Sequence, residues 1–328
     1  SSSPIEWIEI SNTSGLRVVL LSYGATLVSV YFPDKNGKEH DIVRGYDTIE
    51  GYEEDKYMMG KTIGRTSGRL KDGQIQLYDE SERIQLEKNH GGHQIHGGSF
   101  SIAKKNWEVD SRSNTSVTFI VKQKHEEDGY PGDATIKCTY TVNDLNQLII
   151  EHFAETTEPS PIALTNHAYW NLDEDSERIH DHHLYVRASR RLRLDDQLVP
   201  TGEFRPVEGT PFNFLRMRRI GPDPERINPD ALQIDEDLIL DDHKLESPSS
   251  GIRMTITSTY PSIHIYTAHN LDGSQIGKKG RPLGKYTGLA IEPQHYTCAA
   301  YFPDFPSVLT TKDKPSKEEI VYSFLHIQ

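Results

Sequence analysis

Cysteine is scarce in this chain, which has only Cys138 and Cys298 among 328 residues. Two cysteines in a chain of this length do not make the disulfide framework of a secreted domain, so we expect reduced thiols and a cytoplasmic location. The start of the chain also lacks the basic and then apolar stretches of a signal peptide. Its apolar runs are only a few residues long, so we expect no membrane-spanning segment.

Positive charge is in short supply as well. Lysine and arginine total 36 against 49 aspartates and glutamates, which gives a formal net charge of -13 and a pI near 5.6. An acidic surface of this kind argues against a nucleic-acid partner and against binding to an anionic membrane. It leaves a small neutral substrate open.

Three familiar nucleotide and hydrolase motifs are missing. The segment Gly273–Lys278 is one residue short of a phosphate-binding loop and lacks the final serine or threonine. No GxGxxG follows an expected strand, and no GxSxG elbow occurs. These absences weaken a nucleotide-cofactor or serine-hydrolase function, and we expect no cofactor.

Strand signals dominate what is present. Arg17–Tyr23 and Thr26–Phe32 are rich in β-branched and aromatic residues, and Asp34–Gly37 is a turn in which Asn-Gly accepts positive φ. Asn143-Asp144 predicts a hairpin, and residues 48–55 predict one short helix. Many short strands with few helices predict an all-β fold, a large antiparallel sandwich, and we find no linker that would divide residues 1–328 into two domains. The other expected strands cover residues 74–78, 116–124, 134–142, 147–155, 252–258, 263–268 and 320–325.

Three short segments place ionisable side chains in apolar or glycine-lined settings. They are His93–Gly98, Leu164–Leu172 and Gly288–Gln294. Together they offer two imidazoles and a carboxylate, which is enough to move one proton onto a substrate and another off it. The candidate residues are His96, His167 and Glu292.

Each segment also has a simpler interpretation. Glycines on both sides of His96 fit either a surface turn or the close approach of a ligand. The aromatic residues after His167 fit either core packing or a platform for the apolar face of a sugar. Glu292 on an apolar strand is costly unless it is functional or forms an ion pair, for example with an arginine. Burial would raise the pKa of this carboxyl toward a value that is useful in a general base.

Two further clusters carry polar side chains. Arg65 and Arg69 lie four residues apart among small residues, and arginine offers a rigid fork of donors to substrate oxygens or to a salt bridge within the loop. His90, His93 and His96 recur every three residues, a spacing that suits metal ligands on a helix. The glycines between them disfavour a helix, so we expect no metal site.

The three segments, taken together and in this order, resemble those of the aldose 1-epimerases, the galactose mutarotases, including the mutarotase domains of fungal galactose-pathway proteins. The resemblance runs from the Tyr23-Gly24-Ala25 turn to the Glu292 segment. It implies a β-supersandwich with a free monosaccharide bound in an open cleft. It also implies that Glu292 is the catalytic base, that His167 is the general acid, and that His96 holds the sugar near its ring oxygen.

Four more residues are implied as sugar ligands by the same resemblance. Arg69 and Asp235 match residues that bind sugar hydroxyls, although Asp235 aligns more loosely. Gly68 stands where the family commonly has asparagine, and His264 stands where it commonly has glutamine. These two departures leave the acid and the base in place, so we expect them to affect the choice of sugar more than the reaction.

The implied activity is the interconversion of α- and β-anomers of a free aldohexose, galactose or glucose. Two alternatives stay open at this point. One is a non-catalytic sugar-binding or sugar-sensing protein on the same fold, although binding alone needs no matched acid and base. The other is a hexose 6-phosphate epimerase, for which the cluster Arg216, Arg218 and Arg219 could hold a phosphate or could simply be a solvated face.

Overall fold

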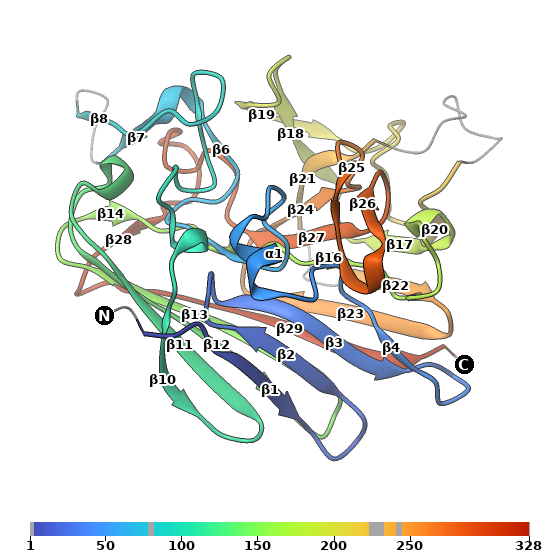
Figure 1. Ribbon diagram of the computed structural model, residues 1–328. Helices are drawn as coiled ribbons and strands as arrows, with labels where there is room; N and C mark the ends of the chain where they lie inside the picture. The colour runs from blue at the N-terminus through green and yellow to red at the C-terminus, as the bar shows by residue number, and fades with distance from the viewer. Residues whose placement is uncertain (1–2, 78–81, 223–232, 241–244, 328) are drawn as a thin grey trace.

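The computed structural model describes residues 3–77, 82–222, 233–240 and 245–327, and strands dominate it (Figure 1). One α-helix is found in these ranges, α1 (Ile49–Glu53), and the hydroxyl of Thr48 caps it by accepting from the Gly51 N–H at 3.1 Å. This helix is shorter than the expected 48–55. No helix in the described ranges is long and apolar enough to cross a membrane. The 3-10 turns are η1 (Lys71–Gly73), η2 (Ile102–Lys104), η3 (Glu127–Gly129), η4 (Ile179–Asp181) and η5 (Lys278–Gly280).

The lower half of the view in Figure 1 holds two sheets. The smaller has the order β1 (Trp7–Ser11), β2 (Arg17–Leu21), β3 (Thr26–Pro33), β4 (Glu39–Asp41). The larger has nine strands in the order β10 (Glu108–Arg112), β11 (Ser116–Gln123), β12 (Ala134–Val142), β13 (Gln147–Thr156), β29 (Ser316–His326), β23 (Ile252–Ser258), β22 (Leu245–Ser249), β17 (His183–Val186), β20 (Arg218–Arg219).

A third sheet lies above them and carries most of the candidate residues. Its order is β16 (Tyr169–Trp170), β27 (Leu289–Gln294), β24 (Ser262–Tyr266), β21 (Asp235–Ile239), β18 (Arg190–Leu194), β19 (Pro200–Pro206). Shorter pairs complete the fold: β5 (Thr62–Ile63) with β15 (Thr165–Asn166), β6 (Arg69–Leu70) with β9 (Gln94–Ile95), β7 (Gln74–Gln76) with β8 (Arg83–Gln85), β14 (Ser160–Pro161) with β28 (Leu309–Thr310), and β25 (Asp272–Ile276) with β26 (Pro282–Gly284).

Side chains on alternate positions of the long strands build the core. In β12 the side chains of Ile136, Cys138 and Tyr140 are buried, and the residues between them are half-buried. This period of two is what a sheet with one covered face requires. One apolar cluster includes residues of all three large sheets, so the sheets share a core rather than each forming its own.

The strand expectations are confirmed in place and type, within a few residues at each end. The Asn143-Asp144 hairpin joins β12 to β13, and the Asp34–Gly37 turn joins β3 to β4 with Gly37 at φ +83°. Tyr78, the end of one expected strand, lies outside the described residues. The large all-β antiparallel sandwich is therefore confirmed.

Candidate active site

A row of ionisable side chains crosses three neighbouring antiparallel strands of the third sheet. Asp237 on β21 pairs with His264 on β24, and His264 pairs in turn with Glu292 on β27. Successive residues of a strand point to opposite faces, so their neighbours Ile263 and Ile291 enter the apolar core instead. The register of the sheet thus places three ionisable groups side by side on one face.

This face forms the floor of a cavity of about 350 Å³. The strand pair β6–β9 and the turns after β9 and β15 add further walls. All seven residues singled out from the sequence line this cavity: Gly68, Arg69, His96, His167, Asp235, His264 and Glu292. The fold therefore collects residues from positions 68 to 292 around one space that suits a small molecule.

His167 and Glu292 are direct neighbours. His167 Nε2 lies 3.3 Å from Glu292 Oε1, and the side chains are only 7% and 2% exposed. Burial raises the pKa of Glu292 to about 8 and lowers the pKa of His167 to about 4. Between these values the pair holds one proton, which needs to move only about the length of a hydrogen bond to turn the neutral pair into an ion pair.

The partner of Glu292 is therefore a histidine and not an arginine. A structural ion pair would hold the carboxylate with a fixed cation, and would lower the pKa of that carboxylate. The observed direction is the opposite one. A titratable neighbour and a raised pKa in a cavity are typical of an acid–base site.

His264 lies between two aspartates. Its Nε2 is 2.8 Å from Asp235 Oδ1, and its Nδ1 is hydrogen-bonded to Asp237 Oδ1. These two bonds raise the pKa of His264 well above its usual value despite its burial, and the same histidine holds the pKa of Asp235 below the usual range. The group is thus a fixed imidazolium with both ring nitrogens occupied. We expected these nitrogens to face sugar hydroxyls, but the aspartates occupy them.

His96 is held by backbone geometry. Its φ is +50°, its Nδ1 accepts the Gly68 N–H at 3.2 Å, and its ring meets the His167 ring edge-on at 5.2 Å between centroids. Because Nδ1 accepts, the neutral ring carries its proton on Nε2. Burial, with His167 next to it, lowers the pKa of His96 well below the usual value, so this ring is a neutral donor.

Gly68 lacks the side chain of an asparagine, but it does not open space in the cavity. A Cβ atom at Gly68 would lie 2.9 Å from the hydroxyl oxygen of Thr297 and 3.0 Å from its methyl carbon. The backbone φ of +71° also favours glycine. The side chain of Thr297, which we did not single out, fills the room that an asparagine side chain would need.

The two arginines of the Gly64–Arg69 segment have different functions. Arg69 lines the cavity, and its Nη1 lies 3.5 Å from Asp235 Oδ2. Arg65 is fully buried, and it donates to the side chain of Gln123 and to the carbonyl of Pro131 at 2.8 Å each. Arg65 therefore stabilises the loop, whereas Arg69 is available to a ligand.

The histidines at positions 90, 93 and 96 do not form a shared metal site among the described residues. His93 Nδ1 accepts the Asp72 N–H at 2.9 Å, and its Nε2 is hydrogen-bonded to Gln197, so both ring nitrogens have protein partners. Across the described ranges, one group of three or more His, Cys, Asp or Glu residues has its possible ligand atoms within 4.8 Å of one another. It consists of His40, Asp173 and Asp175, and it does not line the cavity.

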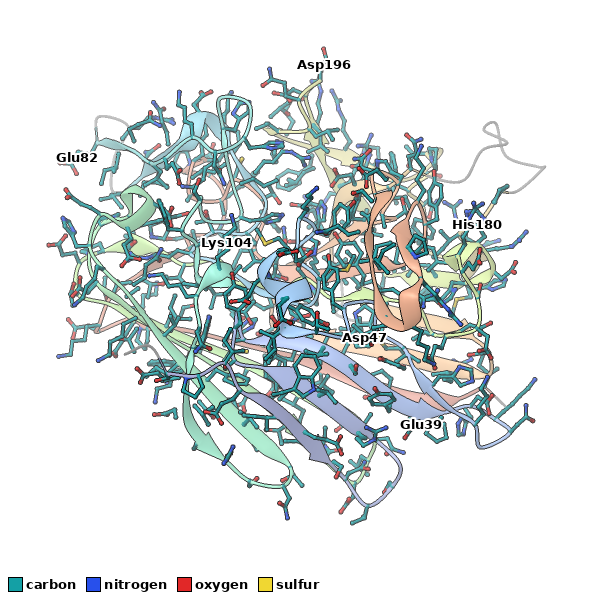
Figure 2. The ribbon with its side chains drawn as sticks, in the orientation of Figure 1. Glu39, Asp47, Glu82, Lys104, His180 and Asp196 are labelled. Atoms are coloured by element: carbon teal, nitrogen blue, oxygen red, sulfur yellow. The ribbon has the colours of Figure 1, made fainter. Side chains whose placement is uncertain are left out.

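A second histidine cluster lies at His180, His182 and His183, and its charged and polar flanks in the sequence predict a solvated loop. His180 lies at the edge of the molecule (Figure 2), but His182 is buried and its Nε2 accepts the Leu172 N–H at 2.8 Å. The expectation was wrong for His182, because that ring supports the chain directly after the Trp170 strand.

Several cavity residues escaped the sequence reasoning. Asp237, Tyr266, Asn270 and Thr297 line the space, as does Tyr169, for which the sequence left core packing and a sugar platform open, and its ring lies 5.2 Å from that of His167. Asp237 and Tyr266 could have been found, because each lies two residues from a candidate and so shares its face of the strand. Thr297 follows the strand in a turn, and no pattern in the sequence indicates it.

This fold and cavity define a β-sandwich protein with a buried histidine–glutamate pair in a cavity that suits a small polar ligand. A family model for aldose 1-epimerases matches residues 6–323. The galactose mutarotase of Bos taurus is 31% identical over 311 residues, which cover 92% of this chain and 88% of that relative. The chain belongs to the aldose 1-epimerase family, and it is accordingly an isomerase that interconverts the anomers of an aldose.

Solved structures of aldose epimerase homologues share the fold of this chain. An aldose epimerase homologue from C. elegans superposes with a TM-score of 0.92 at 41% identity, over 99% of this chain and all of that one. The galactose 1-epimerase of Lactobacillus acidophilus shares the fold, with a TM-score of 0.85 at 23% identity, over 99% of this chain and 96% of that one.

Proposed function

We propose that the cavity binds free galactose or glucose in its pyranose form and that the pair His167 and Glu292 catalyses the exchange of anomers. The observation that carries the proposal is the contact of 3.3 Å between these two buried side chains at the floor of the cavity. Two groups that share one proton can give and take protons at two oxygens of the same substrate.

The proposed reaction is a ring opening followed by a closure. Glu292 takes the proton of the C1 hydroxyl, the C1–O5 bond breaks, and His167 gives a proton to O5. The open chain turns about the C1–C2 bond. His167 then takes the proton back from O5, O5 attacks the other face of C1, and Glu292 returns its proton to O1. The enzyme finishes in its starting state, and no redox partner is consumed.

The remaining candidates hold the sugar during this sequence. His96 donates from Nε2 to the ring oxygen, which would keep O5 beside His167. Arg69 and Asp235 bind hydroxyl groups, and His264 holds Asp235 in place. Binding the sugar in one orientation places its O1 and O5 atoms beside the acid and the base. Such positioning contributes a large part of the rate in many enzymes.

The charges lining the cavity favour a neutral sugar over a phosphorylated one. Its cationic side chains, besides the histidines, are Lys56 and Arg69, and Arg69 already faces Asp235. The cluster Arg216, Arg218 and Arg219 does not line it. These observations support a free aldohexose as the substrate.

The test is a mutarotation assay by polarimetry across free and phosphorylated sugars. Fresh α-D-glucose and α-D-galactose should both lose optical rotation faster with the enzyme than without it, whereas the 6-phosphates should show little acceleration. Binding of galactose without acceleration would support a sugar sensor instead.

We also propose that the chain is one domain in a reducing, cytoplasmic setting, which is supported by two buried and unpaired thiols, Cys138 and Cys298.

A further inference from the structure

A second cavity, larger than the sugar cavity, lies beside the strand pair β25–β26. Its volume is about 500 Å³, and its walls carry six lysines or arginines against four carboxylates. The chain as a whole carries a net charge of -13, so the sign of the charge is reversed in the wall of this cavity. We propose that this cavity binds a small organic phosphate, and that Arg44 links it to the catalytic motifs.

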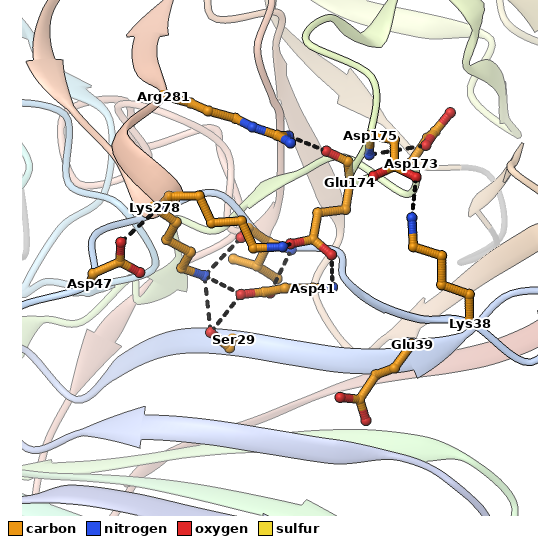
Figure 3. A network of polar contacts seen from close by, with 12 residues as sticks. Ser29, Lys38, Glu39, Asp41, Asp47, Asp173, Glu174, Asp175, Lys278 and Arg281 are labelled. Atoms are coloured by element: carbon orange, nitrogen blue, oxygen red, sulfur yellow. Dashed lines mark hydrogen bonds and ion pairs between the residues drawn. The ribbon is translucent and has the colours of Figure 1, made fainter.

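Part of the charge is balanced within the wall (Figure 3). The ammonium of Lys278 is buried and lies 2.8 Å from Asp41 Oδ2. Lys279 forms an ion pair with Glu174, and the same carboxylate accepts the Asp41 N–H at 3.0 Å. These two lysines and two acids neutralise each other, so they do not attract a ligand.

The arginines are not balanced in this way. Arg44 donates from Nε to the carbonyl of Thr287 at 2.8 Å and from Nη2 to that of Ser176 at 2.6 Å, and Arg281 donates to the carbonyl of Glu174. Carbonyl oxygens fix a guanidinium without cancelling its charge. Burial lowers the pKa of Arg44, and the nearby Arg281 lowers it further, whereas Asp41, Glu174 and Asp173 raise it without forming an ion pair with Arg44.

Two more cations stand at the mouth of this cavity. Lys285 and Arg178 are exposed and line it, and Lys285 has no hydrogen bond or ion pair with any described residue. A planar guanidinium binds two oxygens of a phosphate at once, and an ammonium adds a point charge. The apolar walls at Leu271 and Leu283 leave room for the organic part of the ligand.

Arg44 connects this cavity to both halves of the active site. Its backbone N–H donates to the carbonyl of Tyr169 at 2.8 Å, two residues after His167. Its side chain holds Thr287, which comes just before the strand that carries Glu292. Leu271 lines both cavities. A phosphate that draws Arg44 toward itself would therefore act on the segments that position the acid and the base.

The binding test uses glycerol 3-phosphate, which has no pyranose ring, with glycerol as the uncharged probe. Calorimetry on the intact protein should show binding that weakens with salt, persists with saturating glucose, and is absent for glycerol. Lys285→Glu should weaken it at least about fivefold, and Arg281→Gln about tenfold. Lys314→Glu, an equal charge change at an exposed lysine outside the cavity, should leave it unchanged.

Several results would overturn the proposal. Equal affinity in the wild type and in both cavity variants would show that the phosphate binds elsewhere. Loss of binding in saturating glucose would place it in the sugar cavity. Lys285→Glu lies on the surface and should keep the wild-type melting temperature, so a failure of Arg281→Gln to fold would not remove the test. Because binding is measured without turnover, its outcome is independent of the proposed catalytic roles.

The link through Arg44 has its own readout. Saturating glycerol 3-phosphate should change kcat or KM for glucose at least about twofold in the wild type, and should change neither in Lys285→Glu at the same concentration. Binding with no change in either constant would disprove the link and leave a simple anion site.

Discussion

Two histidine–carboxylate groups share the floor of the sugar cavity, and they behave in opposite ways. His264 donates to two aspartates, and its pKa is raised well above the usual value, whereas the pKa of His167 beside Glu292 is lowered to about 4. The side chains of His264 and His167 are 18% and 7% exposed, and burial lowers the pKa of each, so burial alone cannot account for the difference. The number and length of the hydrogen bonds decide it: two short bonds stabilise the charged ring of His264, and one contact of 3.3 Å does not do so for His167.

The comparison shows how one cavity can hold a fixed charge and a mobile proton side by side. The His264 group keeps its proton throughout the physiological range and supplies a constant field. The His167 pair holds a single proton that can lie on either partner. Changes at Glu292 and at His264 each alter one side of this contrast.

Glu292→Gln should have the largest effect. The amide keeps the shape of the side chain but cannot exchange a proton, so turnover should fall by at least about 10²-fold. The matched control is Glu236→Gln on β21, two strands away in the same sheet, a buried carboxylate that pairs with Arg191 and does not line the cavity. Polarimetry on both variants checks this, and more than a tenth of wild-type turnover in Glu292→Gln would exclude Glu292 as the base.

The same variant, Glu292→Gln, should be more stable than the wild type at alkaline pH, although it is less active. The folded carboxyl has a pKa of about 8 against a usual value near 4.5, so the folded state binds more protons between these values and its stability falls as pH rises. Glutamine removes this penalty. The melting temperature of Glu292→Gln should exceed that of the wild type by at least about 2 °C at pH 9, and the two should converge near pH 4.

The pH profile of kcat/KM should be bell-shaped. Activity requires one proton on the pair, so the rate should fall at low pH as His167 gains a second proton, near its pKa of about 4, and at high pH as Glu292 loses the last one, near about 8. At pH 9 the rate should be about tenfold below the plateau. A flat profile up to pH 10, after subtraction of the spontaneous reaction, would show that the pair does not titrate in this way.

The fold, and the presence of His167 and Glu292 in one site, could be predicted from the sequence, because local patterns indicate both. The period of two in β12 and the Asn143-Asp144 turn indicate a hairpin, and the segments around His167 and Glu292 are distinctive enough to resemble a family. The state of His264 could not be predicted in this way. It depends on Asp235 and Asp237 from another strand, and only the register of β21 against β24 brings these carboxylates to both ring nitrogens.

His264→Gln should have a moderate effect. Removing the imidazolium takes away a positive charge that lowers the pKa of Glu292, so that pKa should rise and the alkaline limb should move to higher pH by at least about half a unit. Because Asp235 and Asp237 then lose their shared donor, kcat/KM should fall about tenfold for galactose and glucose alike. An unchanged alkaline limb would show that His264 does not act on the pair.

Gly68→Asn should affect the choice of sugar only when room is made for it. Alone, the new side chain meets Thr297, and we expect lower stability with no gain of selectivity. Combined with Thr297→Ala, it should change the galactose-to-glucose ratio of kcat/KM at least about fivefold, because a polar group left unpaired by the wrong sugar costs about 1–3 kcal/mol. The measurement is a side-by-side assay of the single variants and the double variant. Equal ratios in all of them would exclude position 68 from substrate choice.

Chelation should have the smallest effect. The proposed reaction needs no metal, and both ring nitrogens of His93 have protein partners. Activity after dialysis against EDTA should equal that of the untreated enzyme within error. Loss of activity that stoichiometric zinc restores would require a metal in the mechanism.

The alternation of β24 has a consequence for refolding. If this strand paired one residue out of register, Ile263 and Ile265 would face the sugar and His264 would enter the apolar core. Such a molecule would lack His264 in the cavity and would bury this ring in the apolar core. We therefore expect a molecule with β24 out of register to be inactive rather than partly active. The mutarotation activity recovered after dilution from denaturant should therefore be proportional to the fraction of molecules in which β24 is in register. Circular dichroism would instead report every chain that has formed strands.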